Sequence, residues 1–308
     1  MPDPVVALWP VNVGRRLARL EDWTAMVGDR LAAAAAAGAD ILVLPEYACA
    51  QWLSVLPEKL APTAEIPWMA AQAPALLYSL RPLVNRHDVA LVAGSIPLPA
   101  PGGGYANRAV TLLPGGGEMT HDKLTLTPDE RDEACWNLAK GNAVTVFEWR
   151  GVRWSVVICL DIEQPAVAVE LGRMEPDVVL VPSMTTTLAG YHRVFDCAKA
   201  RAVELFACVA AVGTIGDCGG FCHGADLNIS GAAAYVPCER DLGHTGVWGT
   251  PLPPRGAADD EGPLWVSPPL PVERLRAMKR DGTAAVWTGM YDAAALECRD
   301  LTLTRPAG

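Results

Sequence analysis

Apolar and polar positions follow two recurring patterns along the chain, one typical of buried strands and one typical of amphipathic helices. Short apolar runs of about four to eight residues predict strands, and longer stretches with apolar residues three or four positions apart predict helices. The predicted strands cover residues 5–9, 41–44, 89–96, 105–113, 144–149, 152–158, 178–181, 207–212 and 231–236. The predicted helices cover residues 16–37, 70–87, 165–174 and 191–206.

The order of these elements predicts a mixed α/β fold. Strands that alternate with helices favour crossover connections, while the neighbouring runs 144–149 and 152–158 predict a hairpin. Pro74 and Pro82 blur the bounds of the second helix, because proline removes a helix hydrogen bond. Residues 250–271 are rich in Pro, Gly and Asp and predict a surface loop or an extended arm.

Composition favours one large globular domain and argues against a nucleic-acid-binding or membrane-spanning protein. With 308 residues, 51% of them hydrophobic, the chain can bury a large core in one domain that spans residues 1–308. The formal net charge of -10 and the lack of a basic stripe argue against a nucleic-acid partner. The most apolar stretch, residues 31–44, is interrupted by Gly38 and Asp40 and is short for a bilayer span, so no membrane segment is predicted.

Cysteine usage predicts reduced thiols. The chain has nine cysteines, an odd number, without the spacing of a disulfide framework, and residues 1–4 lack the features of a signal peptide, so the predicted location is cytoplasmic. Cys218, Cys222 and His223, with Cys238 downstream, leave a metal-binding module as an alternative. Their spacing lacks the paired units of structural zinc sites, so we predict no metal and no cofactor.

A cysteine ends the most informative apolar run, residues 154–158. Cys159 is followed at once by turn residues, and Pro165 suits the first turn of a helix. The C-terminal edges of strands carry the chemistry of many α/β proteins, so Cys159 is predicted on a tight elbow whose backbone N–H groups would stabilise a thiolate and an oxyanion. The alternative is a buried cysteine that fills core space.

Two further segments favour a catalytic thiol. Glu46 follows the apolar run 41–44, and Lys123, one of only five lysines, precedes an alternating stretch. A carboxylate, an ammonium and a thiol on separate strand ends can converge on one cleft, where the carboxylate accepts the thiol proton and the ammonium stabilises the developing negative charge. Each residue alone would be read as a solvated surface group, but with Cys159 they predict a Glu–Lys–Cys triad.

The order and spacing of these residues resemble the nitrilase superfamily of carbon–nitrogen hydrolases. Its pattern is a Glu after a strand and a Pro, a Lys before Leu, and a Cys elbow. Residues 176–183 resemble the next strand of that family, and residues 197–204 resemble its Arg-Ala-x-Glu helix. The resemblance covers roughly residues 4–290. It implies a four-layer αββα sandwich and, because a C-terminal arm crosses the dimer interface in that family, at least a homodimer.

The departures from the family pattern bear on the reaction. Leu160 stands where the family often has Tyr, and Gln164 and Ala166 stand where it has Phe and Glu. Nitrile-cleaving members typically read Cys-Trp-Glu, whereas Cys159, Leu160 and Asp161 are closer to the amide-cleaving branches. The predicted activity is therefore hydrolysis of a small amide or N-carbamoyl compound. Nitrile hydrolysis, acyl transfer and a non-catalytic scaffold are the alternatives, and a thiol peptidase would need a histidine in a protease motif, which we do not find.

The resemblance also implies a second Glu that positions the lysine and the substrate. Glu130 and Glu133 compete for this role, and Glu130 leads because residues 128–130 resemble a Pro-x-Glu stretch of the aliphatic-amidase branch. A solvated acidic loop is the alternative. In the implied mechanism Cys159 attacks the amide carbonyl, Lys123 and the N–H of Leu160 hold the oxyanion, and Glu46 moves the protons.

Several further side chains are predicted to contact the substrate. The predicted pocket residues are Tyr47, Leu160, Met184 and Trp136. In addition, Arg193 or Tyr191 is expected to meet a polar group of the substrate.

Overall fold

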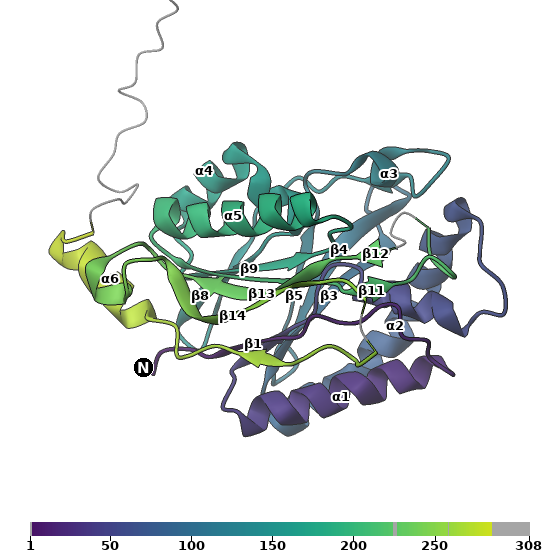
Figure 1. Ribbon diagram of the computed structural model, residues 1–308, viewed down its shortest axis with the longest axis horizontal. Coiled ribbons are helices and arrows are strands. Elements are labelled where there is room, and N and C mark those ends of the chain that lie inside the picture. Colours follow the sequence, from purple (N-terminus) through teal and green to yellow (C-terminus); the bar gives the residue numbers. More distant parts are fainter. Residues whose placement is uncertain (1, 224–226, 258, 285–308) are drawn as a thin grey trace, which may run out of the picture.

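The computed structural model describes residues 2–223, 227–257 and 259–284. Two β-sheets stack face to face, and helices cover the outer face of each sheet (Figure 1). This arrangement is the four-layer αββα sandwich that the resemblance implied.

Two long helices, α1 (Leu20–Ala36) and α2 (Pro62–His87), cover the outer face of the first sheet. Its strands are β1 (Val6–Leu8), β2 (Ile41–Val43), β3 (Ala90–Pro99), β4 (Tyr105–Leu112), β5 (Glu118–Asp122), β6 (Leu138–Ala139) and β15 (Trp265–Val266). Their order is β15-β1-β2-β3-β4-β5, and β6 pairs with β4. The pairs β1·β2 and β2·β3 are parallel, as predicted for strands joined by helical crossovers.

The second sheet carries α4 (Pro165–Met174) and α5 (Leu188–Leu205) on its outer face (Figure 1). Its strands are β7 (Val146–Trp149), β8 (Val152–Val156), β9 (Val178–Ser183), β10 (Cys208–Gly213), β13 (Ser230–Tyr235) and β14 (Val247–Arg255). Their order is β14-β13-β10-β9-β8-β7. The strands β7 and β8 pair antiparallel, which confirms the predicted hairpin, and β8, β9 and β10 run parallel.

The remaining elements are short or lie at the edges. They are α3 (Pro128–Arg131), α6 (Val272–Asp281), the small sheet of β11 (Gly216–Asp217) and β12 (Leu227–Asn228), and the 3₁₀ helices η1 (Ala48–Val55), η2 (Cys159–Glu163) and η3 (Arg240–Leu242).

The alternation of side chains along each strand divides the interior into two apolar cores. In β1, Val6 and Leu8 belong to the core that includes both sheets and α5, whereas Ala7 belongs to the core under α1 and α2. The central strands are therefore buried on both faces and read as continuous apolar runs.

Two predictions about element bounds were wrong. Helix α2 begins at Pro62 and continues through Pro67, Pro74 and Pro82, because residues such as Met69 and Leu80 bury one of its faces against the sheet. The segment 250–271 was predicted as a loop or arm, yet its first part completes β14. The bounds of α2 and β14 depend on packing against neighbouring elements, which the local amino-acid composition does not reveal.

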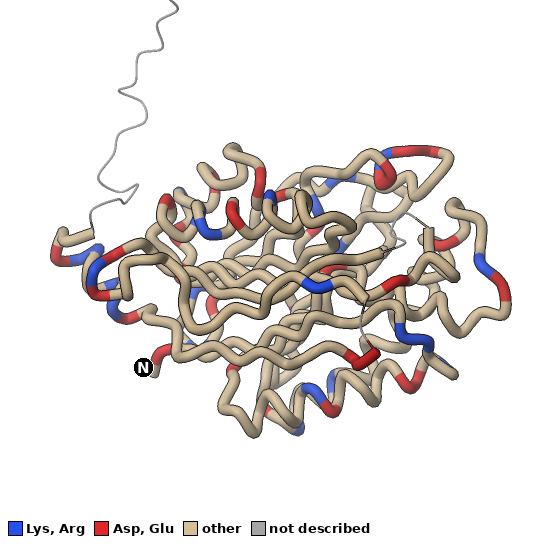
Figure 2. The backbone as a smooth tube through the Cα atoms, viewed as in Figure 1, with Lys and Arg blue, Asp and Glu red and all other residues tan. Residues whose placement is uncertain are grey.

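Charged residues occur mostly along the peripheral helices and loops, with acidic and basic residues intermixed (Figure 2). Among the described residues, none of the helices combines the length and hydrophobicity that crossing a bilayer requires. The cytoplasmic location and the homodimer stay predictions. The sequence also predicts a C-terminal tail after the segment 250–271, and residues 285–308 lie outside the described residues.

Candidate active site

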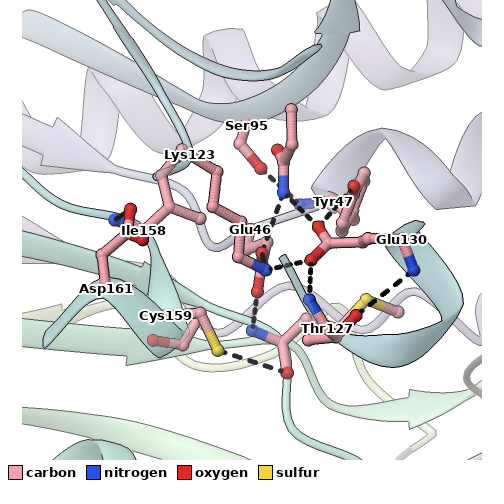
Figure 3. Close-up of polar contacts among 12 residues, drawn as sticks. Glu46, Tyr47, Ser95, Lys123, Thr127, Glu130, Ile158, Cys159 and Asp161 are labelled. Atoms are coloured by element: carbon pink, nitrogen blue, oxygen red, sulfur yellow. Dashed lines mark hydrogen bonds and ion pairs between the residues drawn. The ribbon is translucent and has the colours of Figure 1, made fainter. Parts of the chain in front are cut away.

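Three segments that are far apart in the sequence meet at one site (Figure 3). Glu46 follows β2, Lys123 follows β5, and Cys159 follows β8. The first two come from one sheet and the third comes from the other. The sandwich therefore brings the cation and its carboxylate to the thiol across the boundary between the two sheets.

Lys123 lies between two carboxylates in a fully buried ion cluster. Its Nζ is 2.7 Å from Oε1 of Glu46 and 2.7 Å from Oε2 of Glu130, and each of the three side chains is at most 2% exposed. The side-chain amide of Asn107 donates to Oε1 of both carboxylates at 2.9 Å. The N–H of Thr127 donates to Glu130 at 2.8 Å. The structure thus places Glu130 against the lysine, whereas Glu133 is exposed.

Cys159 sits on a strained turn at the end of its strand. Its φ is +46°, a left-handed conformation that a non-glycine residue adopts at a cost of about 1–3 kcal/mol when its surroundings hold it. Its sulfur contacts the carbonyl oxygen of Met184 at 3.6 Å. The N–H of Met184 donates to Oε2 of Glu46 at 2.8 Å, so the backbone of Met184 links the thiol to the carboxylate.

Burial and charge set the protonation states of the cluster. Burial raises the pKa of Glu46 above its usual range, although the Lys123 ammonium opposes this. Burial would also raise the pKa of Glu130, but the nearby Lys123 holds it below the ordinary value. For Lys123, burial favours the neutral amine, yet the two carboxylates raise its pKa above the ordinary value. The cluster therefore holds a permanent ammonium and two carboxylates of unequal basicity.

The thiol of Cys159 is not a resting thiolate. Burial raises its pKa well above the ordinary value, the charge of Glu46 adds to this, and the Lys123 ammonium opposes it only in part. The elbow was predicted to stabilise a thiolate through its N–H groups, and this expectation was wrong: the raised pKa favours the thiol, whose hydrogen-bond partner among the described backbone groups is the Met184 carbonyl. The structure instead holds a protonated thiol beside a buried base, an arrangement that suits proton transfer during attack.

A cavity of ≈ 370 Å³ opens onto these groups. The predicted pocket residues that line it are Tyr47, Trp136, Leu160 and Met184, and Arg193 lines it as well. Tyr191 does not line it, and its ring stacks on Phe195 with centroids 4.2 Å apart. The polar part of the wall includes Asp129, Glu163, Thr185, Thr186 and Thr187.

Tyr47 and Trp136 form the aromatic wall of the cavity. Their ring centroids are 4.8 Å apart, and the hydroxyl of Tyr47 donates to Glu130 at 2.8 Å. The indole N–H of Trp136 donates to the buried carboxylate of Glu65 at 3.0 Å. The aromatic wall is therefore fixed by hydrogen bonds at both ends.

Two buried polar residues that organise the site were not predicted from the sequence. Asn107 lies within β4 and bridges both carboxylates, and Asp161 binds the backbone around Lys123 and Cys159. A polar residue inside an apolar strand pattern is the signal that could have identified Asn107. Asp161 was noted only as part of the elbow pattern.

The alternative metal site and the peptidase alternative find no support in the described residues. Cys218 and Cys222 are buried and Cys238 is exposed, and no group of three or more His, Cys, Asp or Glu within the described ranges could hold a metal ion. None of the five histidines, all of which are described, lines the cavity next to Cys159.

The fold and this cysteine-containing site define a protein of the nitrilase type. The family model for carbon-nitrogen hydrolases matches residues 14–237, so the chain belongs to the carbon–nitrogen hydrolase family. Among solved structures, the chain resembles a nitrilase-superfamily amidase from Nesterenkonia AN1, with 22% identity and a TM-score of 0.64 over 92% of this chain and 97% of that one. In another structure of that amidase, acrylamide has added to the active-site cysteine.

Curated relatives include three proteins with hydrolase or amidase names. The probable hydrolase YhcX of Bacillus subtilis is 26% identical over 78% of this chain and 46% of its own length. An (R)-stereoselective amidase of a Pseudomonas species is 33% identical over 42% of this chain and 46% of its length. The omega-amidase YafV of Escherichia coli K12 is 29% identical over 60% of this chain and 66% of its length. The chain thus matches about half the length of the first two relatives.

Proposed function

We propose that the protein hydrolyses a carbon–nitrogen bond of a small linear amide through a thioester on Cys159. One observation carries the proposal: a buried lysine, held at 2.7 Å from each of two buried carboxylates, lies beside a thiol that lines a cavity. Such a combination supplies a nucleophile, a base and a fixed positive charge for the reaction.

In the first half-reaction, the sulfur of Cys159 forms a bond to the amide carbon while Glu46 accepts the thiol proton. The raised pKa of Glu46 makes it a stronger base than an exposed carboxylate. The carbonyl oxygen becomes an oxyanion that the Lys123 ammonium stabilises together with the N–H of Leu160. That N–H, at the start of η2, has no acceptor among the described residues. The carbon–nitrogen bond then breaks as Glu46 returns the proton to the leaving nitrogen.

In the second half-reaction, a water molecule replaces the amine. Glu46 takes a proton from this water, the oxygen attacks the thioester carbon, and the same donors stabilise the second oxyanion. The carbon–sulfur bond breaks, and Glu46 returns its proton to the sulfur. The products are a carboxylic acid and the restored thiol.

The cavity favours a small substrate over a peptide. Its volume of ≈ 370 Å³ is near the lower end of the range for ligand pockets, about 300–1,000 Å³. The names of two relatives, an amidase and an omega-amidase, support an amide as the scissile group. We therefore propose short amides, omega-amides and N-carbamoyl compounds as the substrate classes.

A screen for released ammonia or amine over these classes tests the proposal. Nitriles form a second arm, and amides mixed with an amine acceptor form a third that detects acyl transfer. In the parent protein, rapid acid quenching should trap the acyl-enzyme as a mass increase on the Cys159 peptide, and Glu46→Gln should form it more slowly because it lacks the base that accepts the thiol proton. If no amide is turned over, or if Cys159→Ala retains the activity, the proposal is wrong.

A further inference from the structure

Asp161 lies at the junction between the lysine segment and the cysteine elbow, and its side chain is fully buried. Its Oδ1 accepts the N–H groups of Leu124 at 3.1 Å and Thr125 at 2.8 Å, the two residues just after the lysine. Its Oδ2 accepts the N–H of Ile158, just before the cysteine, at 3.3 Å (Figure 3). One carboxylate therefore binds the backbone beside both the ammonium and the thiol.

His121 extends this contact to the other side of the lysine. It lies in β5, two residues before Lys123, and its Nε2 is 3.4 Å from Oδ2 of Asp161. The side chain is only 2% exposed, and its Nδ1 has no hydrogen-bond partner among the described residues. Asp161 thus fastens the lysine segment both before and after Lys123.

This arrangement matters because the cysteine conformation is strained. A positive φ at a non-glycine residue persists only where neighbouring contacts hold it. The bond from the N–H of Ile158 to Asp161 is one such contact, directly next to Cys159. Hydrogen bonds to a buried carboxylate are stronger than those between neutral groups, so they suit this task.

We propose that Asp161, supported by His121, is a positioning residue that fixes the Lys123 ammonium relative to the sulfur of Cys159. The inference rests on the proposed function, since it assigns a role in the same thiol chemistry. Asp161 contacts the backbone of the site and does not line the cavity. Its loss should therefore slow the chemical step without weakening substrate binding, because a displacement of about 1 Å can cost about 10²-fold in rate.

The test compares Asp161→Asn with Asp177→Asn. Asp177 is a second buried carboxylate that accepts a backbone N–H, that of Arg153 at 2.8 Å, but it lies at the opposite end of β9 from the site. In Asp161→Asn we expect kcat to fall about 10²-fold while KM changes less than about threefold. The rate at which iodoacetamide labels Cys159 should fall at least about fivefold. In Asp177→Asn the melting temperature should fall, with both rates within about twofold of the parent protein.

Two substitutions at His121 separate positioning from packing. His121→Gln keeps a side-chain N–H that can donate to Asp161 and should retain kcat within about threefold. His121→Phe fills the space but removes the donor, and kcat should fall about tenfold.

Three outcomes would overturn the inference. They are an Asp161→Asn variant with an unchanged kcat and labelling rate, one in which only KM rises, and one in which labelling changes no more than in Asp177→Asn. If the parent protein hydrolyses no amide, the proposed function fails, while the labelling comparison still decides whether Asp161 positions the thiol.

Discussion

The protein places a buried thiol beside a buried glutamate in two regions, and only the region of the proposed active site combines them with a buried lysine and a cavity. The first is the site of Cys159 and Glu46. The second, which we call the Glu65 cluster, consists of Glu65, Trp136, Cys222 and His223. Here the sulfur of Cys222 lies 3.9 Å from Oε2 of Glu65, and both side chains are fully buried.

The two regions share their acid–base character. Burial raises the pKa of Glu65 as it does for Glu46. The pKa of Cys222 is well above the ordinary value, first because of a hydrogen bond with Cys218 and then because of burial, so this thiol is also protonated. A buried thiol next to a basic carboxylate is therefore not enough to define a catalytic cysteine.

A buried cation and a cavity separate them. Glu46 shares the Lys123 ammonium with Glu130, and Cys159 lines a cavity. Neither Glu65 nor Cys222 lines that cavity, and the nearest basic group to Glu65, His223, is 27% exposed at its side chain. The comparison teaches that charge stabilisation and access, more than the thiol itself, distinguish the region that we propose as the reaction centre.

The largest expected difference between the two regions is the effect on kcat of removing each thiol. Cys159→Ala should lower kcat by about 10⁴-fold or below detection, because no other nucleophile can form the thioester. Cys222→Ala should change kcat less than about threefold. Steady-state ammonia release measures both, with circular dichroism as the control for folding. Equal losses in the two variants would show that the regions are not functionally distinct.

The bases give the next contrast. Glu46→Gln keeps the shape of the side chain but cannot accept a proton, so kcat should fall about 10²- to 10⁴-fold. Glu65→Gln should lower kcat less than about tenfold, through the position of Trp136 alone. The same ammonia assay measures both variants. Near-normal activity in Glu46→Gln would show that Glu46 is not the base.

The cations provide a contrast in stability. Lys123→Met leaves two carboxylates buried without their ammonium and should lower the free energy of unfolding by about 3–5 kcal/mol. Lys59→Met removes an exposed lysine near Glu65 and should change it by less than about 0.5 kcal/mol. Urea unfolding measures both.

A double variant sharpens this test. Adding Glu130→Gln to Lys123→Met removes one of the two stranded charges and should restore part of the lost stability. A further loss in the double variant would contradict the charge-based explanation.

The pH dependence gives the smallest contrast, a change of about tenfold per pH unit. Glu46 acts as a base only when deprotonated, so kcat/KM should fall as the pH drops through its pKa. That pKa is raised, so the acidic limb should lie above pH 4.5. The limb should persist in the Glu65→Gln variant. Burial also raises the pKa of Glu65 in the parent protein, but this carboxylate does not line the cavity. If the acidic limb of kcat/KM shifts to another pH in Glu65→Gln, the protonation of Glu65 affects the reaction, and the two regions are not independent.

Much of the framework could be predicted from the sequence because it depends on local patterns. The period of apolar positions identified the central strands and α1, α4 and α5, and strand ends followed by Glu46 and Cys159 indicated where chemistry would occur. The resemblance to a known family supplied the sandwich. The first turns of α2, before residue 70, and strand β14 were not predicted, since their prolines are tolerated only through packing and pairing with distant residues.

The sequence by itself determined which side chains this protein offers for chemistry: one thiol on an elbow, a carboxylate after a buried strand and a rare lysine. Only the tertiary structure decided that Glu130 and not Glu133 faces Lys123, that Asn107 and Asp161 complete the site, and that the thiol rests protonated. The physical reason is that burial and the distances between charges set hydrogen bonds and pKa values. Both arise only when segments distant in the chain pack together.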